Sequence, residues 1–363
     1  MAIKTVINFQ ATDGAKTVVT IGEGKARELI GKFKQAYIVA DKKVASLYPL
    51  LFHSERVFLT EGGEDAKSIK KLGSLLEWLS NSRCTRGDMI IAVGGGSVGD
   101  LAGFAAAVYM RGVRWNVVPT TLLSMTDSSL GGKTAVNIGG VKNLAGAFHQ
   151  PERVVIDPSF LLTLPETEYI SGMGEVIKTA AIADKKLFNI LSVETNKVLS
   201  RDITLMKEVI AACCRIKGKI VSADPCESDK RMALNAGHTI AHAIESDSCC
   251  RIPHGHAVAI GLYIETFIGE KLVHCKKGTA DKIAQILALY NCPSSYIPES
   301  AENFIKVMES DKKRYIKDIL YIPFIKKIGK TVVNKTDAAV FYDEARIFFS
   351  RTPNFPDNKS VIC

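Results

Sequence analysis

The sequence predicts an α/β protein in which a Rossmann-like N-terminal domain is followed by an all-helical domain. Short apolar runs alternate with helical stretches as far as Val118, which is the order that builds a parallel sheet. Beyond Asp157, long helical periods dominate and clear strands nearly vanish. We therefore expect an α/β domain at residues 1–157, a helical domain at residues 158–349 and a loosely ordered tail at residues 350–363.

The individual elements follow from apolar periodicity. Residues 89–93 (MIIAV) are fully apolar, as a strand buried on both faces requires. Strands are expected at residues 4–9, 17–21, 36–40, 89–93, 115–118 and 154–156, and helices of the first domain at residues 25–33, 64–80 and 100–109. Helices of the second domain are expected at residues 179–191, 203–221, 232–245, 257–275 and 279–290.

Glycines follow strand 89–93 at once, at positions 94, 95, 96 and 99. This G-x-G-x-x-G pattern forms a turn whose backbone N–H groups can approach a pyrophosphate at a helix N-terminus. A dinucleotide site also needs a carboxylate for the ribose after the next strand, but Pro119, Thr120 and Thr121 stand there. The glycines alone leave a tight packing turn equally open.

A carboxylate for the ribose could come from elsewhere in the first domain. Asp41 ends the strand at 36–40, where a ribose partner is expected, although an Asp in this place also forms turns. Glu64 and Lys67 open the next expected helix and could be ligands or ordinary first-turn residues.

Between residues 124 and 143, polar and apolar side chains alternate in a way that suits the wall of a cleft better than a solvated surface. The polar positions are Asp127, Ser128, Ser129, Gly131, Gly132, Lys133, Thr134, Asn137, Lys142 and Asn143. Arg111 lies just upstream, between Met110 and Gly112. Several of these side chains, such as those of Arg111 and Lys133, are of types that bind anions.

Composition excludes several classes of partner. The formal net charge of +9 is carried by scattered pairs such as Lys42-Lys43, so a small anionic substrate fits better than nucleic acid. No apolar stretch approaches the roughly 20 residues of a membrane span, and residues 1–10 lack a signal-peptide core. We expect a cytoplasmic protein with no membrane partner. The 9 cysteines, odd in number and without C-x-x-C, are expected to be reduced.

Four of the 7 histidines fall within residues 238–256. His238 and His242 are spaced i, i+4 and share one helix face, while His254 and His256 precede another helix. Catalytic zinc commonly takes three His and carboxylate ligands and keeps one position open, and Glu175 is a candidate carboxylate. An isolated HxxxH pair would favour simple packing, but the second His-rich loop favours a metal site.

Further polar residues accompany this cluster. Lys178 follows Glu175 by one helical turn, and Lys217, Arg231 and Asn235 lie on the approach to the histidines. On a solvated helix face they would be unremarkable, whereas beside a metal they would bind a phosphate or carboxylate.

Six motifs together resemble the 3-dehydroquinate synthase family along nearly the whole chain. They are GGGSVGDLAGFAAAVYMRG, VPTTLLSMTDSSLGGKTAVN, KNLAGAF, SGMGEVIKTA, LNAGHTIAHAIE and HGHAVAIG. The resemblance implies an NAD-binding α/β domain, a helical metal-binding domain, an active site in the cleft between them and a homodimer.

The resemblance also implies a set of site residues. The metal, zinc or cobalt, would be held by Glu175, His238 and His254. NAD would be held by Asp41, Glu64, Lys67, Gly95, Gly96, Asp100, Thr120, Thr121 and Lys142. Substrate would meet Asp127, Lys133, Asn143, Lys178, Lys217, Arg231, Asn235, His242, one of Lys312 or Lys313, and Arg111 from the partner subunit.

His256 departs from the family, many members of which have HGE where this chain has HGH. Residues two apart in a helix diverge by about 200°, so only one of His254 and His256 can face the other ligands. The motif match selects His254.

The activity implied is conversion of 3-deoxy-D-arabino-heptulosonate 7-phosphate, a small anionic sugar phosphate, to 3-dehydroquinate. In the implied sequence, NAD⁺ oxidises the substrate transiently, phosphate is eliminated, the hydride returns, and an aldol closure forms the ring. Three alternatives remain: another sugar-phosphate cyclase, a metal-dependent polyol dehydrogenase of the same fold, and a non-catalytic NAD-binding regulator.

Overall fold

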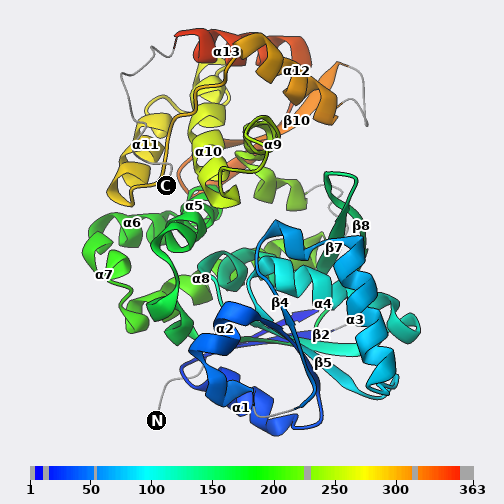
Figure 1. The fold of residues 1–363 in the computed structure, drawn as a ribbon. Coiled ribbons are helices and arrows are strands. Elements are labelled where there is room, and N and C mark those ends of the chain that lie inside the picture. Colours follow the sequence, from blue (N-terminus) through cyan, green and yellow to red (C-terminus); the bar gives the residue numbers. More distant parts are fainter. Residues whose placement is uncertain (1–4, 11–15, 53–54, 225–229, 313–317, 352–363) are drawn as a thin grey trace. The chain divides into compact units, whose positions relative to one another are not determined.

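The computed structural model describes residues 5–10, 16–52, 55–224, 230–312 and 318–351. It divides into two compact units (Figure 1). The first comprises Met1–Gly172 with Asn196–Arg231, and the second comprises Met173–Thr195 with Met232–Cys363. This division differs from the expected boundary after residue 157. Helix α8 (Ile203–Ala223) packs against strand β1 (Thr5–Gln10) and a helical turn at Ser124–Ser128, and so belongs to the first unit.

The first unit is built on a seven-stranded sheet of order β1-β2-β9-β6-β5-β3-β4. The strands are β1 (Thr5–Gln10), β2 (Lys16–Ile21), β3 (Tyr37–Asp41), β4 (Val57–Thr60), β5 (Met89–Gly94), β6 (Arg114–Pro119) and β9 (Arg153–Ile156). Only the edge pair β1–β2 is antiparallel. The Rossmann-like α/β prediction is confirmed, although β4 was not predicted. Its apolar run, Val57 to Leu59, is shorter than the roughly four to eight residues that mark a strand.

The helices of this unit are α1 (Lys25–Lys32), α2 (Lys42–Leu47), α3 (Ile69–Asn81), α4 (Gly96–Val108), α7 (Thr195–Leu199) and α8. Helix α4 packs on β3, β5 and β6. The helix expected from residue 64 begins only at Ile69, because the Ser68 hydroxyl accepts a hydrogen bond from the Lys71 N–H and caps it there. Residues Glu64–Ala66 form a separate 3₁₀ turn, η2.

The strand order reverses direction between β3 and β5. From β3 the chain moves outward to β4, returns to β5 on the other side of β3, and then continues to β6. Ligands of open parallel sheets bind beyond the carboxyl ends of the strands at such a reversal. The strands that end there are β3, at Asp41, and β5, at Gly94.

An antiparallel hairpin, β7 (Lys133–Ile138) with β8 (Val141–Phe148), carries much of the polar stretch predicted as a cleft wall. Its turn is Gly139-Gly140, with φ of 57° and 80°, left-handed values that glycine adopts without strain. The register slips between Val136 and Ile138, so Asn137 sits at a bulge.

The second unit is mainly helical and is built around α10 (His254–Lys271), most of whose residues are buried. Its other helices are α6 (Lys185–Val193), α9 (His238–Asp247), α11 (Thr279–Leu289), α12 (Ala301–Lys312) and α13 (Ala338–Arg351), with α5 (Glu166–Ala183) entering from the first unit. Helices α12 and α13 pack side by side (Figure 1). In the described ranges, no helix is long and apolar enough to cross a membrane.

Two details differ from the predicted helical domain. The expected helix at 179–191 is split, because the Asp184 carboxylate accepts hydrogen bonds from the N–H groups of Lys186 and Leu187 and starts α6. A hairpin, β10 (Ile319–Lys327) with β11 (Lys330–Asp337), was also missed, so the unit is not all-helical. Residues 352–363 of the expected tail lie outside the described residues, and α13 extends to Arg351.

The cysteines within the described ranges carry free thiols, as expected from their number and spacing. Cys213 and Cys214 are buried in α8, where the Cys214 thiol donates a hydrogen bond to the Met125 carbonyl oxygen over 3.5 Å. Cys249 and Cys250 are exposed and so do not share this packing role.

Candidate active site

Three predicted metal ligands meet in the second unit. Glu175 lies on α5, His238 is the first residue of α9, and His254 is the first residue of α10. One donor atom from each lies within 4.8 Å of the others. Glu175 Oε1 is 3.3 Å from His254 Nε2 and 3.7 Å from His238 Nε2. The side chains therefore converge on one point, which defines a candidate metal site.

Glycines at the points of contact let the three helices that carry these residues approach one another closely. A Cβ placed on Gly174 would lie 2.1 Å from the Gly255 carbonyl oxygen, so α5 and α10 touch through backbone atoms. A Cβ on Gly261 would lie 2.0 Å from the Gly237 carbonyl oxygen, so α9 and α10 do the same. Any larger residue would force the helices apart, and the donor atoms with them.

The charges of the cluster depend on burial and on its ion pairs. Burial would raise the pKa of Glu175, but Lys178 Nζ, 2.6 Å from Oε2, and the two histidines hold this pKa well below its usual value. Burial and Lys178 lower the pKa of His238 well below its usual value. Burial opposes charging of His254, yet its close contacts with the Glu175 and Glu245 carboxylates, each at 3.3 Å, raise its pKa to about 10.

The donor set suits a divalent cation. Two imidazoles and one carboxylate are ligands that zinc uses in catalytic sites, with one position left for substrate. The Glu175 carboxylate is 1% exposed, and neither oxygen accepts a hydrogen bond of regular geometry among the described residues, despite its close ion pairs. A bound cation would satisfy both oxygens, so the residues fit a metal ion.

The neighbouring histidines hold different positions. The His242 ring lies 5.6 Å from the His238 ring, so it borders the cluster. His256 is not part of the group of close donor atoms. Its Nε2 is buried without a hydrogen-bond partner in the described part of the chain, and burial lowers its pKa.

Two buried glutamates that support this cluster were missed by the sequence analysis. Glu245 Oε1 lies 3.3 Å from His254 Nδ1, on the side of the ring away from Glu175. The Glu265 carboxylate accepts hydrogen bonds from the N–H groups of Gly237 (2.8 Å) and Ile240 (3.0 Å), which fixes the start of α9. Of the two glutamates, only Glu245 could have been found from the sequence. It lies seven residues after His238 and therefore on the same helix face.

Glu245→Gln is expected to weaken zinc binding by about 10- to 100-fold, because a carboxylate behind a ligating histidine orients the ring and raises its basicity. The measurement is zinc affinity by competition with a chelator. Glu302→Gln, at an exposed position of α12, is the control for the loss of one charge. Equal zinc affinity of the Glu245 variant and the unmodified protein would contradict a supporting role.

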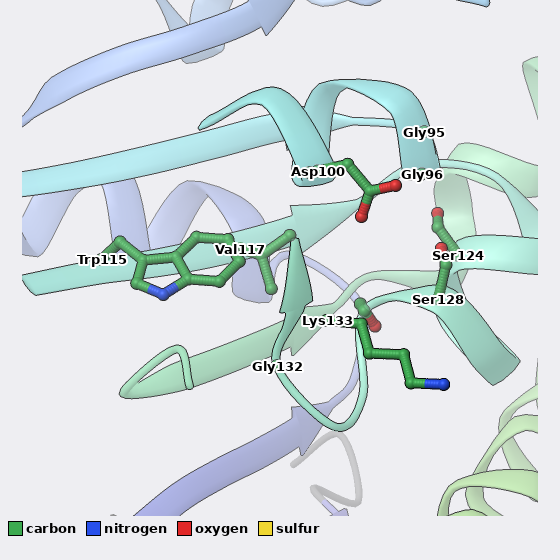
Figure 2. Close-up of a pocket in the computed structure, with 11 residues that line it drawn as sticks. Gly95, Gly96, Asp100, Trp115, Val117, Ser124, Ser128, Gly132 and Lys133 are labelled. Carbon is green, nitrogen blue, oxygen red and sulfur yellow. The ribbon is translucent and has the colours of Figure 1, made fainter. Parts of the chain in front are cut away.

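A pocket of the first unit lies against the glycine turn (Figure 2). Its lining residues are Gly95, Gly96, Gly99, Asp100, Trp115, Val117, Ser124, Ser128, Ser129, Gly132 and Lys133. Figure 2 shows Asp100 and the Ser124 and Ser128 side chains near Gly95 and Gly96.

The pocket has the features of a phosphate site. Helix α4 begins at Gly96, so its amino end faces this region. A Cβ on Gly96 would lie 2.8 Å from Ser128 Oγ, so only glycine keeps this approach open. The buried hydroxyls of Ser128 and Ser129 have no hydrogen-bond partner among the described residues, so they are available to a ligand. These residues fit a nucleotide phosphate group.

Several residues predicted to bind cofactor are brought together here. Lys67, 4% exposed, pairs with Asp100 over 2.7 Å, and Glu64 lies 3.9 Å from the same ammonium. Thr120 and Thr121 follow β6, where the Thr120 N–H bonds the Gly94 carbonyl oxygen. Asp41 caps α2 and lies against Gly62, so its turn-forming role is present. Lys142 lies on β8.

A second group of predicted residues converges on the loop before β7. Lys217 Nζ on α8 lies 2.7 Å from Asp127 Oδ1 and also donates to the Asp127 carbonyl oxygen. A Cβ on Gly131 would lie 2.8 Å from the Arg231 guanidinium, and Lys133 follows two residues later. Three cationic side chains therefore surround one loop, and they make it attractive to an anion.

The remaining predicted residues lie elsewhere. Asn235 ends a 3₁₀ turn at Lys230–Asn235 in the second unit. Arg111 is exposed just after α4, with a left-handed φ of 62°. Lys312 is the last residue of α12, and Lys313 lies outside the described residues.

The fold and these sites define an α/β protein with a largely parallel sheet, a glycine turn after β5 and a candidate metal site in a mainly helical second unit. Two solved structures share the fold. One is 2-deoxy-scyllo-inosose synthase complexed with carbaglucose-6-phosphate, NAD⁺ and Co²⁺ (TM-score 0.82, 23% identity, 94% of this chain and 100% of that chain). The other is the 2-epi-5-epi-valiolone synthase ValA from Streptomyces hygroscopicus subsp. jinggangensis 5008 with NAD⁺ and Zn²⁺ bound (TM-score 0.81, 21% identity, 92% and 96%).

The chain belongs to the 3-dehydroquinate synthase family. The family model of the 3-dehydroquinate synthase N-terminal domain matches residues 57–171, and that of the C-terminal domain matches residues 172–314. The 3-dehydroquinate synthase of Saccharolobus solfataricus is 35% identical over 86% of this chain and 90% of its own length. That of Clostridium acetobutylicum is 40% identical over 79% and 80%. The family predicted from the motifs is confirmed.

Proposed function

We propose that the protein catalyses conversion of 3-deoxy-D-arabino-heptulosonate 7-phosphate to 3-dehydroquinate with release of phosphate. The observation that supports this proposal most strongly is the cluster of Glu175, His238 and His254 in a chain that matches 3-dehydroquinate synthases along most of its length. The reaction also needs a site for the nucleotide and a site for an anionic substrate. The pocket at Gly95 is the candidate for the first, and the cations around Asp127 are the candidate for the second.

We further propose NAD⁺ and a divalent cation, zinc or cobalt, as cofactors. The support is the fit of the residues, together with the NAD⁺ and Co²⁺ or Zn²⁺ named for two proteins of the same fold. When bound, NAD⁺ would take and return a hydride and the cation would polarise substrate oxygens. Glu64, Lys67 and Asp100 would hold the nucleotide, and Glu175 with the two histidines would hold the cation.

The chain's own residues would bind and orient the substrate. Lys133 and Asn143 would donate hydrogen bonds to the phosphate, and Lys217, Arg231 and Asn235 to the carboxylate. Lys178, 2.6 Å from Glu175, keeps that carboxylate ionised beside the reacting oxygens. His242 borders the same cluster, within reach of a substrate hydroxyl.

The test is an assay of the purified protein with the heptulosonate phosphate, NAD⁺ and zinc that follows phosphate, 3-dehydroquinate and NADH together. We expect equal amounts of phosphate and 3-dehydroquinate and no accumulation of NADH, because the hydride returns to the same substrate. Formation of NADH in an amount equal to the product would contradict the proposal and indicate a dehydrogenase. Formation of a different carbocycle from another sugar phosphate would contradict the proposal and indicate another sugar-phosphate cyclase.

Lys133→Ala is expected to lose about 2–5 kcal/mol of transition-state stabilisation, because removal of one cation leaves the bound phosphate partly unpaired. The measurement is kcat/KM for phosphate release. Lys70→Ala, at an exposed position of α3, is the control for the loss of one cation from the first unit. An unchanged kcat/KM in the Lys133 variant would exclude it from phosphate binding.

We also propose a homodimer in which Arg111 acts on the substrate of the partner subunit. Arg111→Ala should be nearly inactive alone and should regain activity when mixed with His254→Ala, because one site of the mixed dimer then contains both native residues. The readout is phosphate release before and after subunit exchange. Absence of recovery in mixed dimers, shown to have formed, would place Arg111 outside the partner's site.

A further inference from the structure

Asn137 stands at the centre of a hydrogen-bonded ring in the first unit. Its amide Nδ2 donates to Glu64 Oε2 over 2.9 Å, and its Oδ1 accepts from the Asn143 backbone N–H over 2.9 Å. Its own backbone N–H donates to the Lys67 carbonyl oxygen over 2.6 Å. Lys67 Nζ closes the ring by donating to Asn143 Oδ1 over 2.6 Å.

This ring joins two sets of residues with different proposed roles. Glu64 and Lys67 belong to the proposed nucleotide site, together with Asp100, which pairs with Lys67 over 2.7 Å. Asn143 belongs to the proposed phosphate site. The two sets are far apart in sequence, and the bulge at Asn137 turns the hairpin edge towards the loop at 64–67, where Ser68 and Asn137 form a parallel bridge.

The ring also fixes how Asn143 is presented. Asn143 has φ 55°, a left-handed conformation that is uncommon outside glycine and needs support from its surroundings. Because Lys67 occupies the amide oxygen, the NH₂ end of the Asn143 side chain is the end left to meet an anion. The ring therefore leaves the donor end of this amide available to an anion.

We infer that Asn137 is a positioning residue that couples nucleotide binding to the placement of Asn143. A nucleotide held by Glu64 and Lys67 fixes the loop to which Asn137 is bonded, and so fixes the bulge and the Asn143 amide. Binding of NAD⁺ and binding of a phosphate group should then strengthen each other, because linkage between two sites is reciprocal. The inference rests on the proposed function, which assigns these two sites.

The first measurement is hydrogen exchange of the 137–148 segment with NAD⁺ absent and at saturation. In the unmodified protein we expect NAD⁺ to slow exchange of the Asn143 amide at least about five-fold, the lower end of ordinary coupling. Asn137→Ala should remove this effect. Asn137→Asp keeps an oxygen that can accept from the Asn143 N–H but places a second carboxylate against Glu64. This variant should therefore also lose the slowing of exchange by NAD⁺.

The second measurement is the dissociation constant of NAD⁺ by calorimetry, with and without inorganic phosphate. Phosphate should tighten NAD⁺ binding in the unmodified protein by at least about five-fold, and by a factor near one in both Asn137 variants. A residue that only stabilises the fold would lower both affinities without changing their ratio. Asn81→Ala and Asn81→Asp, at the exposed end of α3, are the matched controls.

The outcomes separate this inference from the proposed function. NAD⁺ binding without protection of Asn143, or coupling that survives Asn137→Ala, overturns the inference whatever the enzyme turns over. Intact coupling without formation of 3-dehydroquinate overturns the proposed function alone. Absence of NAD⁺ binding to the unmodified protein overturns both.

Discussion

His254→Ala is expected to lose bound metal and phosphate release almost completely. His254 Nε2 lies 3.3 Å from Glu175 Oε1 within the group of close donor atoms, and its removal leaves a catalytic site with only two ligands. Such a pair binds zinc weakly, so the variant should be isolated with far less than one zinc per chain. Metal content by mass spectrometry and the rate of phosphate release are the measurements.

His256→Ala is the matched control, two residues further along the same helix. His256 lies outside the group of donor atoms, so this variant should retain stoichiometric zinc and most of its activity. The reverse pattern, with metal lost from the His256 variant and kept by the His254 variant, would move the ligand by two residues. It would also mean that the change from HGE to HGH had altered the site.

Gly174→Ala is expected to reduce zinc affinity by more than about 100-fold although no ligand is changed. The new methyl group would lie 2.1 Å from the Gly255 carbonyl oxygen, so α5 and α10 must separate by around an ångström. Metal–ligand distances tolerate only about 0.2 Å, so Glu175 and His254 could no longer share one cation. Overpacking should also cost about 1–3 kcal/mol of the free energy of unfolding.

The measurements are zinc affinity by chelator competition and thermal unfolding of the metal-free protein. Gly73→Ala is the control, because a Cβ at Gly73 in α3 meets nothing within 4 Å. It should leave zinc affinity unchanged and raise the free energy of unfolding by about 0.4–1 kcal/mol. Native zinc affinity in the Gly174 variant would show that the helices can separate without moving the ligands.

Much of the fold could be predicted because its main elements have strong local signals. Strand β5 is a continuous apolar run, and the helical periods of α8 and α11 extend over many residues. The misses have weaker or interrupted signals. The apolar run of β4 is only Val57 to Leu59, and the break before α6 depends on one capping carboxylate at Asp184. The apolar run of β10 is interrupted by Pro323, a residue that argues against a strand.

The candidate site divides in the same way. Residues inside local motifs, such as His238 and Lys133, could be singled out from spacing and chemistry. Their supporting contacts could not, because these join positions far apart in sequence. Lys217 reaches Asp127 across 90 residues, and Glu265 reaches Gly237 across 28. The sequence indicated Asn137 only as one polar residue among several. Its role depends on hydrogen bonds to residues of two other segments, which the sequence does not show.

The position of His238 and His254 at the first residues of their helices has an electrostatic consequence. Each helix amino end carries roughly half a positive charge. At α9 the Glu265 carboxylate offsets this charge by accepting hydrogen bonds from the Gly237 and Ile240 N–H groups, whereas the start of α10 has no side-chain cap. Lys178, 2.6 Å from Glu175, and the α10 amino end therefore oppose part of the negative charge that Glu175 and Glu245 bring to the cluster. A cation bound here would keep more of its positive charge than one held by the carboxylates alone. It would draw electron density more strongly from an oxygen bound beside it.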